Sequence, residues 1–210
     1  MFVTFEGVEG AGKSTQIALA EDWLRSQGRD TLVTRQPGGC ALGVELRRIL
    51  LDARNTHLDP MAELFMYLAD RAQHVAQVIR PALAAGKAVL CDRYHDSTVA
   101  YQGYGRGLDV ARLTDLGRMA TGGLAPDVTV VLDLPVALGL GRARGRNAAA
   151  GACQSEGRFE ALETDFHERV RQGFLAMAES EPGRFAVVDA SGSPDEVFAL
   201  VRSAIAARLA

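Results

Sequence analysis

The hydrophobic and polar positions predict a chain in which short strands alternate with amphipathic helices. Short runs of β-branched and aliphatic residues indicate strands, and apolar residues that recur every three or four positions indicate helices. The expected strands are 2–5, 31–34, 88–91, 128–134 and 185–189. The expected helices are 14–26, 43–51, 60–85, 108–122, one from about 136 that gives way at 142–146, 158–180, and a last helix opened by the capping box at 193–196.

This alternation is typical of a parallel sheet that helices cover on both faces. We therefore predict an α/β fold with three layers and a parallel sheet of about five strands. The chain has no internal repeat and no long linker, so residues 1–210 are expected to form a single domain. The stretch 147–157 is rich in Ala and Gly and too short for a linker, and we expect a mobile lid at approximately 142–158.

Composition and charge exclude several classes of protein. With 210 residues, 48% of them hydrophobic and 23% charged, the chain is long enough and apolar enough for one globular domain. A net charge of −3 offers no footprint for nucleic acid, so no nucleic-acid partner is expected. No apolar run reaches the roughly 18 residues of a membrane helix, and the first residues lack the basic start of a signal peptide. Three scattered cysteines without a C-x-x-C pair, Cys40, Cys91 and Cys153, favour a reducing cytoplasm.

A glycine-rich turn between the first strand and the first helix carries the strongest motif. The segment 7–14 reads GVEGAGKS and matches G-x-x-x-x-G-K-[ST], a loop whose backbone N–H groups surround a phosphate at a helix N-terminus. Lys13 would reach the β- and γ-phosphates, and Ser14 would hold Mg²⁺. The expected ATP-binding residues are Gly7, Val8, Glu9, Gly10, Ala11, Gly12, Lys13, Ser14 and Thr15.

A phosphate loop alone predicts only that a nucleoside triphosphate binds. A switch GTPase would need an N-K-x-D motif, but the only lysine besides Lys13 is Lys87, in a Gly-Lys-Ala sequence. The chain is also short for a mechanical ATPase. These two observations leave the small-molecule kinases as the favoured class.

Acidic and basic residues at strand ends suggest how an acceptor is held. Asp92 and Arg93 follow a buried strand at its carboxyl end, where ligands sit in open α/β sheets. Asp92 could help to place Mg²⁺ and Arg93 could bind an acceptor phosphate, although an ordinary ion pair at a strand end is the simpler alternative. Arg35 ends a second strand in the same way.

Arginines also cluster at the expected lid. Arg142, Arg144 and Arg146 lie at the edge of the stretch 147–157 that is rich in Ala and Gly, and Arg158 lies just beyond it. On a mobile segment they could close over the transferring phosphates and stabilise their charge. The alternative is a solvated basic face of a helix.

Four segments occur together and in order: FEGVEGAGKST at 5–15, TRQPGG at 34–39, ADRAQH at 69–74 and DRYHDSTVAYQ at 92–102. In these the chain resembles the bacterial thymidylate kinases, P-loop nucleoside monophosphate kinases that phosphorylate dTMP with ATP to supply dTTP synthesis. The likeness covers essentially the whole chain. It implies the P-loop NTPase fold, ATP and dTMP as substrates, Mg²⁺ as cofactor, a cytoplasmic homodimer formed through helices such as 60–85, and no membrane partner.

The resemblance also implies roles for residues that are individually uninformative. Tyr67, where the family usually has Phe, would stack on thymine, and Arg71 would hydrogen-bond the base. Tyr101 would crowd the 2′ position of the sugar, and Glu9 would lie near the 3′-hydroxyl or the magnesium. The implied dTMP-binding residues are Arg35, Arg47, Tyr67, Arg71, Arg93, Thr98, Tyr101 and Gln102. The implied catalytic residues are Lys13, Arg93, Glu9, Arg142, Arg144 and Arg146, and the implied metal ligands are Ser14 and Asp92.

The chain departs from the family pattern at two positions, and two alternatives stay open. Gln36 replaces an expected Glu and Cys40 replaces a usual Thr or Val, whereas the lid, not the phosphate loop, carries the arginines. A kinase for another nucleotide or nucleoside is one alternative. A regulatory module that binds ATP without turnover is the other, and Gln36 is the feature that motivates it. We expect His74 to be scaffold and His95 to lie on the surface, neither of them a metal ligand.

Overall fold

The sheet has five parallel strands in the order β2-β3-β1-β4-β5, in a computed structural model that describes residues 1–150, 158–159 and 162–208. The strands are β1 (Phe2–Glu6), β2 (Thr31–Arg35), β3 (Ala88–Asp92), β4 (Val128–Asp133) and β5 (Phe185–Asp189). The α/β prediction with about five parallel strands is confirmed, and every strand end lies within one residue of its predicted place.

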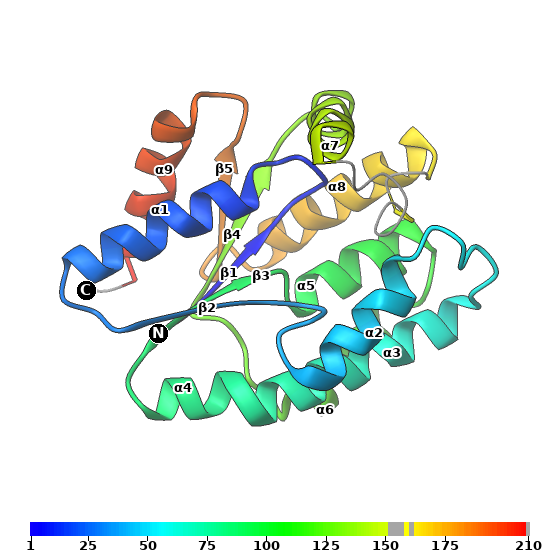
Figure 1. The fold of residues 1–210 in the computed structure, drawn as a ribbon, viewed down its shortest axis with the longest axis horizontal. Coiled ribbons are helices and arrows are strands. Elements are labelled where there is room, and N and C mark those ends of the chain that lie inside the picture. The colour runs from blue at the N-terminus through cyan, green and yellow to red at the C-terminus, as the bar shows by residue number, and fades with distance from the viewer. Residues whose placement is uncertain (151–157, 160–161, 209–210) are drawn as a thin grey trace.

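Helices cover the sheet on both faces, as Figure 1 shows. The helical segments are α1 (Lys13–Ser26), α2 (Ala41–Leu51), α3 (Pro60–His74), η1 (Val75–Ile79), α4 (Arg80–Ala84), α5 (His95–Thr98), η2 (Val99–Gly105), α6 (Val110–Thr121), α7 (Val136–Ala150), α8 (Thr164–Ser180) and α9 (Pro194–Ala206). Helices α1 and α9 pack together beside the sheet, and α8 packs against η2 across from them (Figure 1). None of the described helices is long and apolar enough to cross a bilayer.

Helix starts follow the local sequence signals closely. The Asp59 side chain accepts a hydrogen bond from the backbone N–H of Met61, and Pro60 occupies the first helical position of α3. Ser193 and Glu196 form a capping box at the start of α9. The helices therefore begin where the sequence predicts them whenever the signal is a cap.

Three helical predictions are wrong in part. The helix expected at 60–85 is interrupted by the π-helical turn η1, and the helix from about 136, expected to give way at 142–146, continues as α7 to Ala150. The helix expected from 158 begins at Thr164, because the backbone N–H of Arg158 bonds to Leu51 O and its side chain is tied to other elements. Tertiary contacts here outweigh local helix propensity.

The core explains why the strands read as continuous apolar runs. β1 is buried along its whole length between β3 and β4, and Val3, Phe5, Leu90 and Leu132 have no exposed surface. In the parallel register Phe5 of β1 lies beside Asp92 of β3. The loops that follow these two strands therefore emerge next to each other at the carboxyl edge of the sheet, where ligands bind in such folds.

A buried polar cluster under the sheet links the segment after β3 to the edge of β5. Asp96 pairs with the Arg184 guanidinium, Nη1 to Oδ2 at 2.6 Å, and Thr129 Oγ1 donates to the same carboxylate at 3.0 Å. Thr129 Oγ1 also lies 2.9 Å from Thr4 Oγ1. The Asp96 side chain is 6% exposed and that of Arg184 is 19% exposed, so breaking this pair leaves a charge with little water around it.

We expect Arg184→Leu to lower the free energy of unfolding by about 3 kcal/mol, because Asp96 would keep a buried, unpaired charge. Urea denaturation followed by circular dichroism measures this change. Glu181→Ala is the matched control, because it removes the exposed partner of the same arginine and should change stability by less than about 1 kcal/mol. Equal losses in the two variants would contradict the assigned importance of the Asp96 pair.

Candidate phosphate-transfer site

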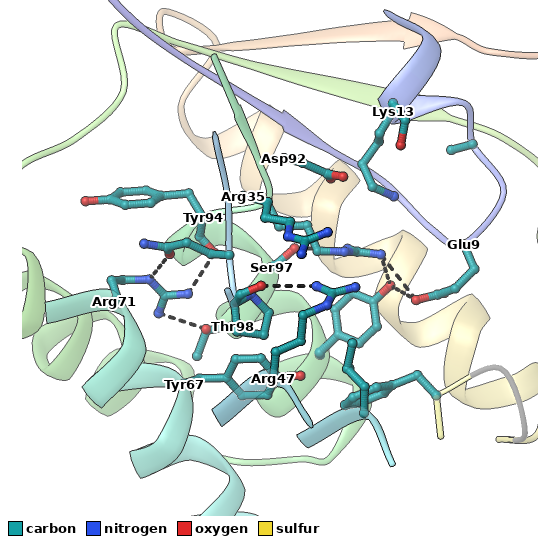
Figure 2. A pocket seen from close by; sticks show the side chains of 18 of the residues that line it. Glu9, Lys13, Arg35, Arg47, Tyr67, Arg71, Asp92, Tyr94, Ser97 and Thr98 are labelled. Carbon is teal, nitrogen blue, oxygen red and sulfur yellow. Dashed lines mark hydrogen bonds and ion pairs between the residues drawn. The ribbon is translucent and has the colours of Figure 1, made fainter. Parts of the chain in front are cut away.

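A cavity of about 550 Å³ opens at the carboxyl edge of the sheet. The loops after β1, β2 and β3, together with α2, α3 and η2, supply its walls. Figure 2 shows charged side chains from these loops converging, with Lys13 and Glu9 on one wall and Tyr67 and Arg71 on another. The sequence-predicted residues that line it are Glu9, Gly10, Ala11, Gly12, Lys13, Ser14, Thr15, Arg35, Arg47, Tyr67, Arg71, Asp92, Arg93, Thr98, Tyr101 and Gln102.

The phosphate loop takes a shape that its glycines permit. Gly7, Gly10 and Gly12 have φ values of 133°, 72° and 91°, which residues with a side chain rarely adopt. At Gly10 a Cβ would also lie 2.0 Å from the carbonyl oxygen of Gly139, at the start of α7. The loop and this helix thus meet backbone to backbone at a place where no side chain fits.

The side chain of Lys13 folds back into the phosphate loop. Its Nζ donates to the carbonyl oxygens of Gly7 and Val8 at 3.2 and 3.1 Å. Burial, together with the positive charge of Arg93, lowers the pKa of Lys13 to about 8 against the opposing effect of Asp92. An anion in the loop would favour the charged form, so the site is electrostatically prepared for one.

A cation fits between Lys13 and the end of β3. Asp92 Oδ1 is buried without a hydrogen-bond partner, and the cavity places its carboxylate together with Ser14. Carboxylate and hydroxyl oxygens are ligands that Mg²⁺ accepts alongside substrate phosphates. Within the described part of the chain no three His, Cys, Asp or Glu side chains group as a metal site, so these two residues fit a cation only in combination with phosphate oxygens.

Arg93 joins the loops after β1 and β3. Its backbone has φ 65°, and its Nη1 donates to Gly7 O and to Ser97 Oγ. Its Nη2 donates to Glu9 Oε1 at 3.2 Å and to the Tyr101 hydroxyl at 2.9 Å. The guanidinium therefore lies against the phosphate loop, where an acceptor phosphate would meet the donor.

Glu9 is charged although it is deeply placed. Burial opposes its ionisation, but contacts with His167 and the charges of Arg93 and Lys13 outweigh burial and lower the pKa of Glu9 to about 2. The Tyr101 hydroxyl donates to its Oε1 at 2.5 Å. His167, on α8, lies beside its other oxygen.

Arg71 forms the opposite wall and is itself held rigidly. Its side chain is buried, with Nε donating to Gln36 Oε1 and Nη1 to Thr98 Oγ1, both at 2.9 Å. Nη2 donates to Tyr94 O, as the dashed lines in Figure 2 mark. Tyr67, one turn earlier on α3, lines the same side of the cavity. This wall combines a flat ring with fixed hydrogen-bond donors.

Gln36, the departure from the family pattern, is integrated into this wall. Besides accepting from Arg71, it places its Nε2 at 2.9 Å from His74 Nδ1, and His74 Nε2 lies 2.7 Å from Thr34 Oγ1. The Gln36 amide nitrogen can only donate, so Nδ1 of His74 accepts and the imidazole is neutral. Burial, helped by Arg71, lowers the pKa of His74 to about 4, which agrees with this assignment.

Gln102 is oriented from behind by Glu63. Its Nε2 donates to Glu63 Oε1 at 2.8 Å, so its donor is used there and its carbonyl oxygen is kept for another partner. Glu63 is completely buried and pairs with Arg106 at 3.1 Å and with Arg158 at 2.6 Å. Arg158, which the sequence places beyond the lid, is thus tied to α3, and Phe159 beside it lines the cavity.

Of the three arginines predicted for the lid, the structure describes the side chain of Arg142 alone, and Arg142 does not line the cavity. Arg142 lies on the exposed side of α7 and donates to the carbonyl oxygens of Ala190 and Ser191. The side chains of Arg144 and Arg146, like residues 151–157, lie outside what the structure describes. Arg142 therefore bonds to the segment after β5, whereas Arg35 and Arg47 do line the cavity.

Sequence reasoning misplaced one buried histidine, His95, and did not single out another, His167. The expectation that His95 lies on the surface is wrong: both its ring nitrogens are buried, because the ring packs on Gly117 of α6. His167 carries no sequence signal, since a lone histidine on an amphipathic helix is usually core. Glu63 was also missed. It is an acidic residue on the buried face of α3, and a buried charge of this kind indicates a specific partner.

Comparison with known proteins gives one consistent answer. The family model described as thymidylate kinase matches residues 5–201. A thymidylate kinase of Desulfovibrio desulfuricans is 60% identical over 209 residues, covering 100% of this chain and 96% of that protein. One from Solidesulfovibrio magneticus is 63% identical over 197 residues, 94% of each chain. The crystal structure of thymidylate kinase from Ehrlichia chaffeensis superimposes with a TM-score of 0.78 at 30% identity, covering 98% of both chains.

We expect Gln36→Glu to raise the pKa of His74 by at least about 1 unit, because a carboxylate can only accept and stabilises the charged ring beside it. Titration of the histidine ring signals by NMR between pH 3 and 8 measures this shift. Gln16→Glu, which changes a buried glutamine on α1, serves as the control and should leave His74 near 4. An unchanged His74 titration in Gln36→Glu would refute the proposed contact between the two side chains.

Proposed function

The chain belongs to the thymidylate kinase family, and from that premise we propose that it transfers the γ-phosphoryl group of ATP to the 5′-phosphate of dTMP, giving dTDP and ADP for dTTP synthesis. One observation carries the proposal. Arg93, in the acceptor segment, donates to Glu9 of the phosphate loop, so donor and acceptor sites share one cavity.

The reaction needs alignment and charge neutralisation more than proton transfer. The acceptor phosphate is already an anion near neutral pH, so no strong general base is required, and no covalent enzyme intermediate is needed. Lys13 would contact the β- and γ-phosphates from inside the loop. Arg93, with Arg35 and Arg47 nearby, would hold the dTMP phosphate in line with the γ-phosphate. Lys13 is buried, so its charge acts on the phosphates more strongly than it would in water.

We propose Ser14 and Asp92 as the residues that hold Mg²⁺ together with the phosphates of ATP. The ion would supply positive charge that neutralises the phosphates as the phosphoryl group is transferred. The unpartnered Oδ1 of Asp92 supports this assignment. For Arg144 and Arg146 we propose the role implied by the family layout, contact with the transferring phosphates. Arg142 would have to leave Ala190 and Ser191 to join them.

The thymine end of the cavity supports dTMP as acceptor. Tyr67 would stack on the base, and Arg71 would donate to it from a fixed position. Thr98 and Gln102 would read the remaining edge, with the Gln102 carbonyl oxygen able to accept from the imino N–H of thymine. Tyr101, whose hydroxyl is held by Glu9 and Arg93, would lie against the sugar and exclude a 2′-hydroxyl.

We further propose that the protein works as one domain, forms a homodimer, and acts in the cytoplasm. Helices α2, α3 and α6 pack side by side, and apolar side chains are exposed on them (Leu42, Val44, Ile49, Met61, Phe65, Val110 and Met119). Covering such a surface with a second copy would remove it from water. Cys40 and Cys91 are free thiols, which suits a reducing compartment where ATP is abundant.

We expect dTMP to stimulate ADP release from the purified protein with Mg-ATP far more than dCMP, dGMP or thymidine does. The reason is that Arg71 and Gln102 offer a donor and an acceptor that match the thymine edge, while thymidine lacks the phosphate that Arg93 would hold. A coupled assay of ADP release measures the rates. Greater stimulation by another acceptor would move the assignment to that nucleotide, and ATP binding without turnover would overturn the kinase proposal.

We expect Lys13→Ala and Arg93→Ala each to lower turnover by about 10²- to 10³-fold, because each removes a preorganised positive charge from the phosphates. Steady-state kinetics with dTMP measures the loss. Lys87→Ala, which changes the chain's only other lysine, and Arg25→Ala on the exposed face of α1 are the matched controls. A variant at position 13 or 93 with near-normal turnover would remove that residue from the mechanism.

A further inference from the structure

His167 is the one buried histidine that reaches a phosphate-loop side chain in the described part of the structure. It lies on α8 with no exposed surface, and its Nδ1 is 3.1 Å from Glu9 Oε2. That distance suits a polar contact, although the ring N–H is not aligned for an ideal hydrogen bond. Such contacts are often imperfect in a ligand-free site and improve when substrates bind.

The chemistry of the two groups settles which atom carries the proton. The Glu9 carboxylate can only accept, so a favourable contact requires the proton on His167 Nδ1. His167 Nε2 is buried and has no hydrogen-bond partner, so the histidine makes its polar contact through one atom. Glu9 is the close polar neighbour of this buried imidazole, and an apolar residue of similar size would pack there without leaving a ring nitrogen unsatisfied.

With this contact, three residues from different elements surround the Glu9 carboxylate. Tyr101, on η2, and Arg93, after β3, both donate to Oε1, whereas His167 reaches the other oxygen from α8. Each carboxylate oxygen is thereby assigned to different partners, and rotation of the carboxylate would break both sets. Helix α8, which carries His167, packs directly against η2, which carries Tyr101.

We propose that His167 is a positioning residue for phosphoryl transfer. It fixes the Glu9 carboxylate so that Glu9 in turn holds Arg93 and Tyr101 in place for the acceptor nucleotide. This inference rests on the proposed kinase function. It assigns control over the geometry of the acceptor side to α8, none of whose described residues lines the cavity.

The test compares variants that remove or keep a donor at Nδ1. We expect His167→Phe to lower kcat/KM for dTMP by about 10- to 100-fold, in the range found when a residue behind a functional group is lost. The KM for ATP should change by less than about threefold, because the partners of the other carboxylate oxygen, Oε1, are Arg93 and Tyr101 on the acceptor side. His167→Asn places an amide N–H near the position of Nδ1 and should recover activity to within about threefold of wild type.

Coupling and folding controls keep the test decisive. In a double-mutant cycle, His167→Phe should add less than about threefold to the loss caused by Glu9→Gln, because His167 acts through Glu9. Val170→Ala, on the buried face of the same helix, controls for lost packing: it should lower the Tm and leave the KM for dTMP unchanged. If His167→Phe does not fold, His167→Gln replaces it, since its amide reaches the Nε2 position instead and should show the same loss.

The outcomes separate this inference from the proposed function. Wild-type protein without dTMP-dependent turnover would refute the kinase proposal and leave nothing for His167 to position. Normal wild-type turnover together with equal losses in His167→Asn and His167→Phe would overturn the positioning role alone. Independent, multiplying losses of His167→Phe and Glu9→Gln would do the same. Loss in Phe, recovery in Asn and a non-additive cycle would support it.

Discussion

The ion pair between Arg93 and Glu9 joins two loops that the sheet brings together but does not itself connect. β1 and β3 are neighbours, with Phe5 beside Asp92, so the chain leaves both strands at the same edge. Parallel strands alone would leave the two loops free to separate. The guanidinium of Arg93 closes that gap by donating both to Gly7 O in the backbone and to the Glu9 side chain. These bonds fix the position of Arg93, on the acceptor side, relative to the phosphate loop.

Burial of charge makes this arrangement rigid. Glu6, fully buried at the end of β1, accepts from the Tyr94 N–H and from Ser97 Oγ, and Ser97 in turn accepts from Arg93. Burial, with the nearby Asp96 charge, raises the pKa of Glu6 to about 7, whereas the hydrogen bonds from Ser97 and Tyr94 and the charge of Arg93 favour its ionised form. A network of this kind has few alternative arrangements, because any member that moves leaves a polar group without water or partner.

The sequence predicts most of what depends on local signals and little of what depends on packing. The strands, the caps at Asp59 and Ser193 and the phosphate loop were all predictable, because each is encoded within a few neighbouring residues. The π-helical turn η2 was not, although it presents Tyr101 and Gln102 to the cavity, because the extra residue in a π-turn has no compositional signature.

The candidate site shows the same division. The motifs in the loops and on α3 predicted which residues line the cavity, and the structure brings them together. What holds them from behind could not be predicted. Glu63 behind Gln102 and His167 behind Glu9 lie on helices distant in sequence, and only the tertiary fold pairs them. Gln36 stands out in the sequence as unusual, but its bonds to Arg71 and His74 are formed only in the tertiary fold.

The contact between Gly10 and Gly139 has an evolutionary consequence. Each glycine is required by the backbone of the segment that faces it. A Cβ at Gly10 would lie 2.0 Å from Gly139 O, and a Cβ at Gly139 would lie 2.4 Å from Glu9 O. Neither position can drift to another residue while the other backbone stays where it is. A side chain at either position would therefore require α7 to move away from the phosphate loop.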